Sequence, residues 1–99
     1  MNYTHVEGKN YGKVVLYAIS TCLWCRKTKE FLTNEGIEFD YIYVDKADGE
    51  EEEEKGRQLD NIVKRWNPRE SFPTTVINDE VAVVGFKPDE IKSALNGEN

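Results

Sequence analysis

Two cysteines, Cys22 and Cys25, are the only cysteines in this 99-residue chain, and they lie two residues apart in the stretch YAISTCLWCRKTKEF (residues 17–31). Such a pair serves as half of a metal site, as a small structural disulfide, or as a working dithiol. A structural zinc site needs about four ligands, and the chain adds only His5, in a polar N-terminal stretch. A zinc site within one chain is therefore not expected, and a dimer that pools two cysteine pairs is the remaining metal alternative.

A structural disulfide is also not expected. The loop closed by two neighbouring cysteines is too short to stabilise the fold much through chain entropy. The composition indicates a cytosolic protein, and thiols are kept reduced in that compartment. A CxxC pair in an otherwise cysteine-free chain with a βαβ pattern indicates a redox motif.

The redox interpretation requires a strand and a helix that meet at the cysteines. Residues 13–19 (KVVLYAI) are β-branched and aromatic, and they predict a buried strand that ends just before Cys22. Residues 23–35 favour a helix, with Gly36 in the position that ends it. Cys22 is therefore expected at the helix N-terminus, where free backbone N–H groups and the helix dipole stabilise a thiolate.

The spacing assigns separate roles to the two sulfurs. The thiolate is the nucleophile of disulfide exchange, so Cys22 is expected to be the exposed group that attacks a partner's disulfide. Cys25 lies about one helical turn further on. It is expected to be more buried, and to attack the mixed disulfide so that the partner is released.

Three further segments complete the predicted fold. Residues 37–45 alternate between two faces and predict a second strand. An acidic run at residues 50–54 is interpreted as a solvated helix start, with partner binding as the alternative. The helix itself is predicted by apolar residues at i, i+3, i+4 and i+7, namely Leu59, Ile62, Val63 and Trp66. Residues 74–78 and 80–85 predict a hairpin, and Pro88 opens a last helix.

The predicted order is β-α-β-α-β-β-α, which indicates an α/β fold. The βαβ unit implies two parallel strands joined by a right-handed crossover, and the hairpin adds an antiparallel pair. We expect a four-stranded mixed sheet with helices on both faces. Residues 13–99 are expected to form this single domain, preceded by a loose extension at residues 1–12.

Composition limits the partners. The chain is 38% hydrophobic and 32% charged, with a net charge of −6. Nucleic acids and anionic membrane surfaces would repel such a protein. The longest apolar run, residues 14–19, is far too short to span a membrane, and residues 1–13 contain no signal-peptide core. A cytoplasmic location is expected.

Three separated features resemble the glutaredoxin-like redoxins of the thioredoxin-fold superfamily, over nearly all of residues 13–95. The first is the strand–CLWC–helix unit. The second is SFPTTVI (residues 71–77), in which Pro73 matches the cis-proline of the family. The third is VVGFKPDEI (residues 83–91) after the last strand.

The resemblance implies a binding groove around the sulfurs. The backbone of Phe72, the residue before the cis-proline, would pair with an extended substrate or with glutathione. Gly85 and Phe86 would complete the groove. Trp24 would either contact the partner or shield Cys25, and the sequence does not separate these two roles.

Departures from the family indicate the electron donor. Typical glutaredoxins carry a lysine before the first cysteine that grips a glutathione carboxylate, and Ile19 stands near that place. The segment GFKPD (residues 85–89) resembles the NrdH-type redoxins, which take electrons from thioredoxin reductase and reduce ribonucleotide reductase. The Leu23-Trp24 pair differs from the dipeptides usual in both groups.

We therefore expect an enzyme, a thiol–disulfide oxidoreductase that reduces protein disulfides, with ribonucleotide reductase as a candidate target. We expect a monomer without a bound cofactor, whose electrons come from NADPH through a thioredoxin reductase-like flavoenzyme. The alternatives are a glutathione-coupled glutaredoxin and a dimer that binds an iron–sulfur cluster or another metal. His5 is expected to be solvated, and Asp89 to be a first-turn helix charge.

Overall fold

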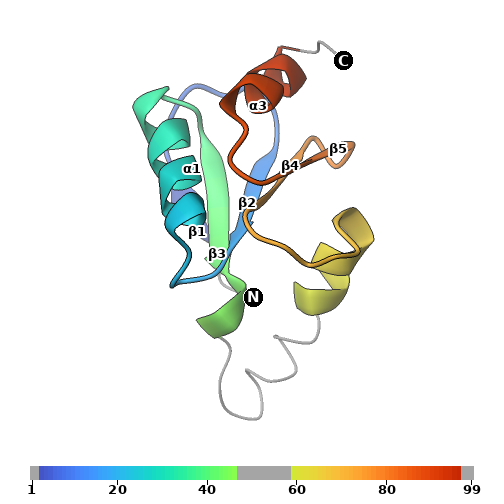
Figure 1. The fold of residues 1–99 in the computed structure, drawn as a ribbon. Coiled ribbons are helices and arrows are strands. Elements are labelled where there is room, and N and C mark those ends of the chain that lie inside the picture. Colours follow the sequence, from blue (N-terminus) through green and yellow to red (C-terminus); the bar gives the residue numbers. More distant parts are fainter. Residues whose placement is uncertain (1–2, 47–58, 97–99) are drawn as a thin grey trace.

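The central sheet has five strands in the order β1-β3-β2-β4-β5 (Figure 1). The computed structural model of the chain describes residues 3–46 and 59–96. The strands are β1 (Thr4–Val6), β2 (Val14–Ala18), β3 (Phe39–Tyr43), β4 (Thr74–Ile77) and β5 (Val81–Val84). All five residues of β2, the middle strand, are buried.

The α/β class and the mixed sheet are confirmed, but the sheet has one strand more than predicted. Thr4–Val6, within the segment expected to be a loose extension, pairs antiparallel with β3, so that Thr4 faces Tyr41 and Val6 faces Phe39. Three residues are too few for an alternating pattern to be visible in a sequence. The β1 strand forms because the edge of β3 is open for pairing, and not because its own composition favours a strand.

The pairing of the other strands follows the prediction. Strands β2 and β3 are parallel, whereas the β2–β4 and β4–β5 pairs are antiparallel. The hairpin between β4 and β5 turns at Asn78 and Asp79, which have φ values of 54° and 52°. Asn and Asp tolerate this left-handed conformation better than most residues.

Helices cover both faces of the sheet, and β2 divides the core between them (Figure 1). Residues 14, 16 and 18 pack in one cluster with α1 (Leu23–Asn34) and α3 (Pro88–Leu95). Residues 15 and 17 pack in the other cluster with Leu59 and Val63, from the helical residues 59–66. The amphipathic helix is thus confirmed, and the acidic run at residues 50–54 lies outside the described residues.

Two helix ends carry the signals expected of them. Helix α1 is followed by Glu35 and by Gly36, whose φ is 68°. Helix α3 begins at Pro88 and has Asp89 and Glu90 in its first turn, where carboxylates interact favourably with the dipole. Strand β3 ends at Tyr43 and continues as a 3₁₀ turn, η1 (Val44–Lys46). Within the described parts of the chain, no helix is long and apolar enough to cross a membrane.

Candidate active site

Cys22 caps the N-terminus of α1, directly after the turn that follows β2. Its Sγ accepts a hydrogen bond from the backbone N–H of Cys25 at 3.1 Å, and its carbonyl accepts one from the N–H of Arg26 at 3.2 Å. The helix therefore begins by donating an otherwise unpaired N–H group to sulfur. Cys22 Sγ thus lies at the N-terminal end of α1, where the sequence analysis expected the attacking sulfur.

The two sulfurs differ in access to solvent. Cys22 is half-buried, whereas Cys25 is 2% exposed and belongs to the core cluster beneath α1. Burial raises the pKa of the Cys25 thiol to about 12, and the hydrogen bond with Cys22 acts in the same direction. The site therefore holds one accessible sulfur and one that is kept protonated behind it.

The loop before β4 lies on the other side of Cys22. The Phe72–Pro73 peptide bond is cis, as the resemblance implied. The carbonyl oxygen of Phe72 lies 4.0 Å from Cys22 Sγ, and the carbonyl of Pro73 accepts a hydrogen bond of 2.8 Å from the N–H of Gly85. This bond links the start of β4 to the end of β5 beside the sulfur.

Aromatic residues from three segments form a hollow next to Cys22. A cavity of about 270 Å³ is lined by Trp24, Phe72, Gly85 and Phe86. The rings of Trp24 and Phe86 are stacked, with centroids 6.0 Å apart and an angle of 24° between their planes. Trp24 is nevertheless 54% exposed. Four of the residues predicted for substrate binding thus line one cavity, and about half of the Trp24 surface is open to solvent.

Asn67 organises the cis-proline loop, and the sequence analysis did not identify it. This buried side chain donates through Nδ2 to the carbonyl and hydroxyl of Ser71, both at 3.0 Å, and to Thr74 Oγ1 at 3.2 Å. Its Oδ1 accepts from the N–H of Arg69 at 3.2 Å. One amide therefore fixes both ends of the segment that contains Phe72.

Asp45 organises the turn before the nucleophile and was also missed. Its carboxylate accepts hydrogen bonds from the N–H of Ser20 at 2.9 Å and from the Ser20 hydroxyl at 2.6 Å. Parallel strands end at the same edge of a sheet, so the residue after β3 reaches the turn after β2. Recognising it would have required following that consequence of the predicted βαβ unit.

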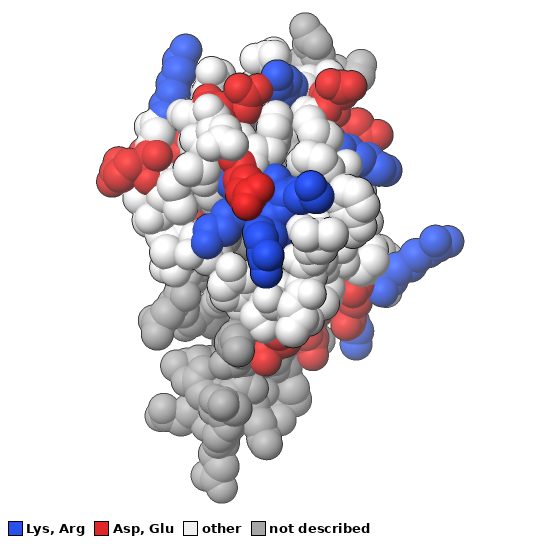
Figure 2. All heavy atoms as spheres, turned by 60° about the vertical axis from the view of Figure 1, so that its left-hand side comes forward, with Lys and Arg blue, Asp and Glu red and all other residues white. Residues whose placement is uncertain are grey.

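The outer face of α1 is more basic than the chain as a whole. Figure 2 shows Lys and Arg side chains gathered around an acidic residue on this side of the molecule. The helix carries Arg26, Lys27 and Lys29 beside a single acid, Glu30, although the chain has a net charge of −6. Leu23, at the same end of the helix as Cys22, is 56% exposed.

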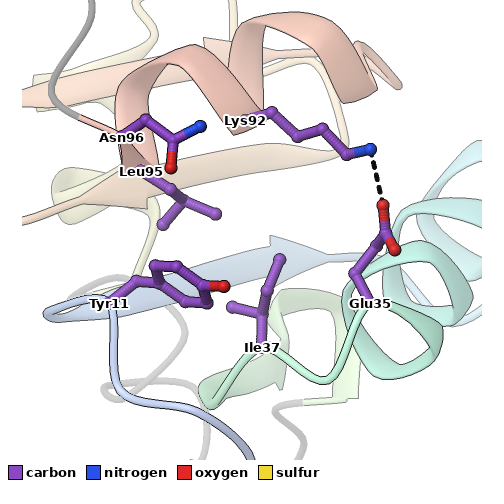
Figure 3. Close-up of a pocket in the computed structure, with 6 residues that line it drawn as sticks. All are labelled: Tyr11, Glu35, Ile37, Lys92, Leu95 and Asn96. Atoms are coloured by element: carbon purple, nitrogen blue, oxygen red, sulfur yellow. Dashed lines mark ion pairs between the residues drawn. The ribbon is translucent and has the colours of Figure 1, made fainter.

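A second hollow lies at the opposite end of α1, about 20 Å from Cys22 by helix rise. It has a volume of about 220 Å³, and its six lining residues are Tyr11, Glu35, Ile37, Lys92, Leu95 and Asn96 (Figure 3). Lys92 from α3 pairs with Glu35 at 2.6 Å across its mouth. His5 is also separate from the sulfurs, because it lies on β1 and contacts Asp40.

Comparisons with known proteins agree with this geometry. Residues 14–82 match the sequence profile of the glutaredoxin family. A glutaredoxin-like 8.6 kDa protein of the rubredoxin operon in Clostridium pasteurianum is 33% identical over 82 residues, which are 83% of this chain and 96% of that protein.

Two solved structures from Methanosarcina species are more similar in sequence. The glutaredoxin of Methanosarcina mazei Go1 is 49% identical, with 94% of this chain and 86% of the other covered and a TM-score of 0.84. Methanoredoxin of Methanosarcina acetivorans is 49% identical, with 89% and 88% covered and a TM-score of 0.79.

The expected likeness to NrdH-type redoxins is weaker than the likeness to these two proteins. The Escherichia coli NrdH-redoxin is 21% identical, with a TM-score of 0.58, and supports the shared fold alone. The profile match and the more similar relatives settle the family instead. This chain belongs to the glutaredoxin family, whose members are thiol–disulfide oxidoreductases with a thioredoxin fold.

Proposed function

We propose that this protein reduces protein disulfides through Cys22 and Cys25, and that a thioredoxin reductase-like flavoenzyme, rather than glutathione, returns it to the dithiol. The observation that carries the proposal is the asymmetry of the two sulfurs. Cys22 is half-buried and its Sγ accepts a hydrogen bond from the Cys25 N–H at 3.1 Å, whereas Cys25 is 2% exposed. A dithiol reductase needs one sulfur for attack and a second held in reserve.

The cycle transfers two electrons and two protons. The Cys22 thiolate attacks one sulfur of the substrate disulfide, which forms a mixed disulfide and releases a thiolate that takes up a proton. Cys25 loses its proton and attacks Cys22 Sγ, which breaks the mixed disulfide and releases the second substrate thiol. The products are a reduced substrate and a Cys22–Cys25 disulfide, which two electrons from NADPH reduce again through the flavoenzyme.

The order of these steps follows from the causes of the raised Cys25 pKa. Burial is the largest cause, followed by the hydrogen bond to Cys22, and the charge of Cys22 also contributes. Both contributions from Cys22 disappear once its sulfur is bound to a substrate. The pKa of Cys25 should therefore fall when the mixed disulfide forms, which activates the second thiol only when it is needed.

The hollow beside Cys22 suits a segment of a protein substrate. The stacked rings of Trp24 and Phe86 offer a flat apolar surface, and aromatic residues of this kind are common anchors at protein interfaces. The backbone of Phe72, next to the sulfur, would pair with an extended chain in the manner of an added strand.

The proposed electron donor is inferred from the residues just before Cys22, which include no lysine for glutathione. Ile19, near the place of the usual glutathione-binding lysine, packs against the core cluster and offers no charge. The segment GFKPD also resembles redoxins served by thioredoxin reductase, which makes ribonucleotide reductase a candidate target. A glutathione-coupled glutaredoxin is the second candidate, because the exposed cations Arg26 and Lys27 on α1 offer another partner for a glutathione carboxylate.

A donor assay on a single substrate, insulin, tests the proposal. The protein is supplied either with NADPH and thioredoxin reductase, or with NADPH, glutathione and glutathione reductase. We expect turnover with the first system and at least 10-fold less with the second. Equal or faster turnover with glutathione would contradict the proposed donor. The variant Ile19→Lys sharpens the test, because it should raise the glutathione-dependent rate, whereas a lysine at exposed Thr21 should raise it less.

A further inference from the structure

Four polar side chains gather on one edge of the sheet, away from the cysteines, and we call them the edge cluster: His5, Glu7, Glu38 and Asp40. His5 faces Asp40 in the β1–β3 register. His5 Nδ1 lies 2.8 Å from Asp40 Oδ1, and His5 Nε2 lies 3.6 Å from Glu38 Oε1 and 3.8 Å from Glu7 Oε1. The redox mechanism uses none of these residues.

We propose that the edge cluster is a zinc site. His5 Nε2 and one carboxylate oxygen each from Glu7 and Glu38 bind Zn²⁺, and water fills the fourth position. These three ligand atoms lie within 4.8 Å of one another. A tetrahedral ion with bonds of about 2.0 Å places its ligands about 3.3 Å apart. The two distances from Nε2 therefore need to shorten by only a few tenths of an ångström.

Asp40 prepares His5 for this role. Because its carboxylate faces Nδ1 at 2.8 Å, the neutral imidazole carries its proton on Nδ1 and leaves the lone pair on Nε2 toward the two glutamates. A carboxylate behind a ligating histidine is a common arrangement at zinc sites, where it orients the ring and raises its basicity.

The local charge favours a divalent cation. The cluster brings three carboxylates to one imidazole, and the oxygens of Glu7 and Glu38 lie within 4.8 Å of each other. Like charges this close repel, and a bound Zn²⁺ offsets the repulsion. The backbone beside Glu7 lies close to the segment that carries Glu38, because a Cβ on Gly8 would lie 2.7 Å from backbone atoms of residues 36–38.

The cluster also borders an open cavity of about 350 Å³, lined in part by His5, Glu38 and Asp40. This space gives a metal-bound water room beside the ligands. Lys13 lines the same cavity, but its Nζ pairs with Asp79 at 3.2 Å, so its charge is compensated. The imidazole nitrogen selects Zn²⁺ over Mg²⁺ and Ca²⁺, which prefer oxygen ligands.

Calorimetric titration of Zn²⁺ into the full chain tests the site. The Cys22→Ser/Cys25→Ser variant is used, because the dithiol would also bind zinc. A pH of 8 is chosen, because the hydrogen bond to Asp40 raises the pKa of His5. We expect one Zn²⁺ per chain, at least 10-fold weaker binding after His5→Ala, and about 10- to 100-fold weaker binding after Asp40→Asn. Glu30→Gln, which removes an exposed carboxylate from α1, should change nothing.

Nitrogen-15 spectra of the imidazole decide the question even if a variant fails to fold. The chain has a single histidine, so its two ring nitrogens are observed without ambiguity. Zinc should shift Nε2 strongly, while Nδ1 keeps its proton, and Mg²⁺ at the same concentration should shift neither. Zinc binding that survives His5→Ala, or a saturating Zn²⁺ addition that leaves Nε2 unchanged, would overturn the proposal.

Discussion

The two hollows at the ends of α1 are similar in size but differ in the groups around them. The cavity at Trp24 and Phe86 has a volume of about 270 Å³, and the one between Tyr11 and Lys92 has about 220 Å³. The first is lined by Phe72, whose carbonyl oxygen lies 4.0 Å from Cys22 Sγ, and by the half-exposed ring of Trp24. The second is crossed by the Lys92–Glu35 ion pair.

This difference indicates that the N-terminal end of α1, and not its C-terminal end, forms the reactive site. At the N-terminus of α1 an N–H group points to Cys22 Sγ, and the cis-proline loop brings the Phe72 carbonyl close to it. At the C-terminus the carbonyls of Phe31 and Thr33 accept hydrogen bonds from the backbone N–H groups of Glu35 and Gly36, which close the end of the helix. Volume alone would not have distinguished the two hollows.

The sharpest contrast is expected in thiol reactivity. In a Cys22→Ser variant at pH 8, Cys25 should react with iodoacetamide at least 100-fold more slowly in the folded chain than in urea. Burial, the largest cause of the raised pKa of Cys25, persists in this variant and keeps the thiolate fraction low, while the contributions of Cys22 to that pKa are removed. The rate should rise with pH, because a higher pH deprotonates more of the buried thiol. Comparable rates in the folded and unfolded chains would show that Cys25 is not protected.

Asn67→Ala should destabilise the active-site end specifically. The change removes the amide that bonds Ser71 and Thr74, and buried partners left unpaired cost about 1–3 kcal/mol. Urea unfolding gives the free energy, and insulin reduction should show a raised KM. Asn61→Ala, at an exposed position of the 59–66 helix, is the matched control. Equal effects of the two changes would contradict the role assigned to Asn67.

Trp24→Ala should separate binding from folding. Because the side chain is 54% exposed, its loss should barely change the free energy of unfolding, while KM for a protein disulfide should rise by about 10-fold. Trp66→Ala should lower the free energy of unfolding and leave KM unchanged, since this half-buried residue packs in the second core cluster. An unchanged KM for the Trp24→Ala variant would show that the protein substrate does not bind at Trp24.

Lys92→Met, at the other hollow, should have the smallest effect. It removes an ion pair between half-exposed side chains, and such pairs contribute little to stability. The urea midpoint should fall less than it does for Asn67→Ala, and turnover should stay unchanged. Lost turnover would indicate that this second hollow takes part in the reaction.

Local patterns in the sequence predicted the elements and the reactive pair. The buried strand before Cys22, the helix after it and the hairpin at Asn78 each depend on neighbouring residues. Asn67 and Asp45 were missed because the hydrogen bonds that they make depend on the tertiary structure. Asn67 lies in a loop without a periodic pattern, and Asp45 meets Ser20 only because β2 and β3 are parallel.

The edge cluster illustrates the same limit. His5 was predicted to be solvated, and it is exposed, but two of its three carboxylate neighbours, Glu38 and Asp40, lie more than 30 residues away along the chain. Finding them required knowing that a three-residue strand pairs with β3. The sequence contains no local signal for that pairing.

Trapping of a mixed disulfide most directly tests whether Cys22 attacks the substrate and Cys25 resolves the mixed disulfide. The Cys25→Ser variant is mixed with an insulin substrate, and the adduct is mapped by peptide mass spectrometry. We predict a stable disulfide through Cys22 together with a loss of turnover, and no adduct from the Cys22→Ser control. Full turnover by the Cys25→Ser variant, or an adduct formed by the Cys22→Ser control, would contradict the account.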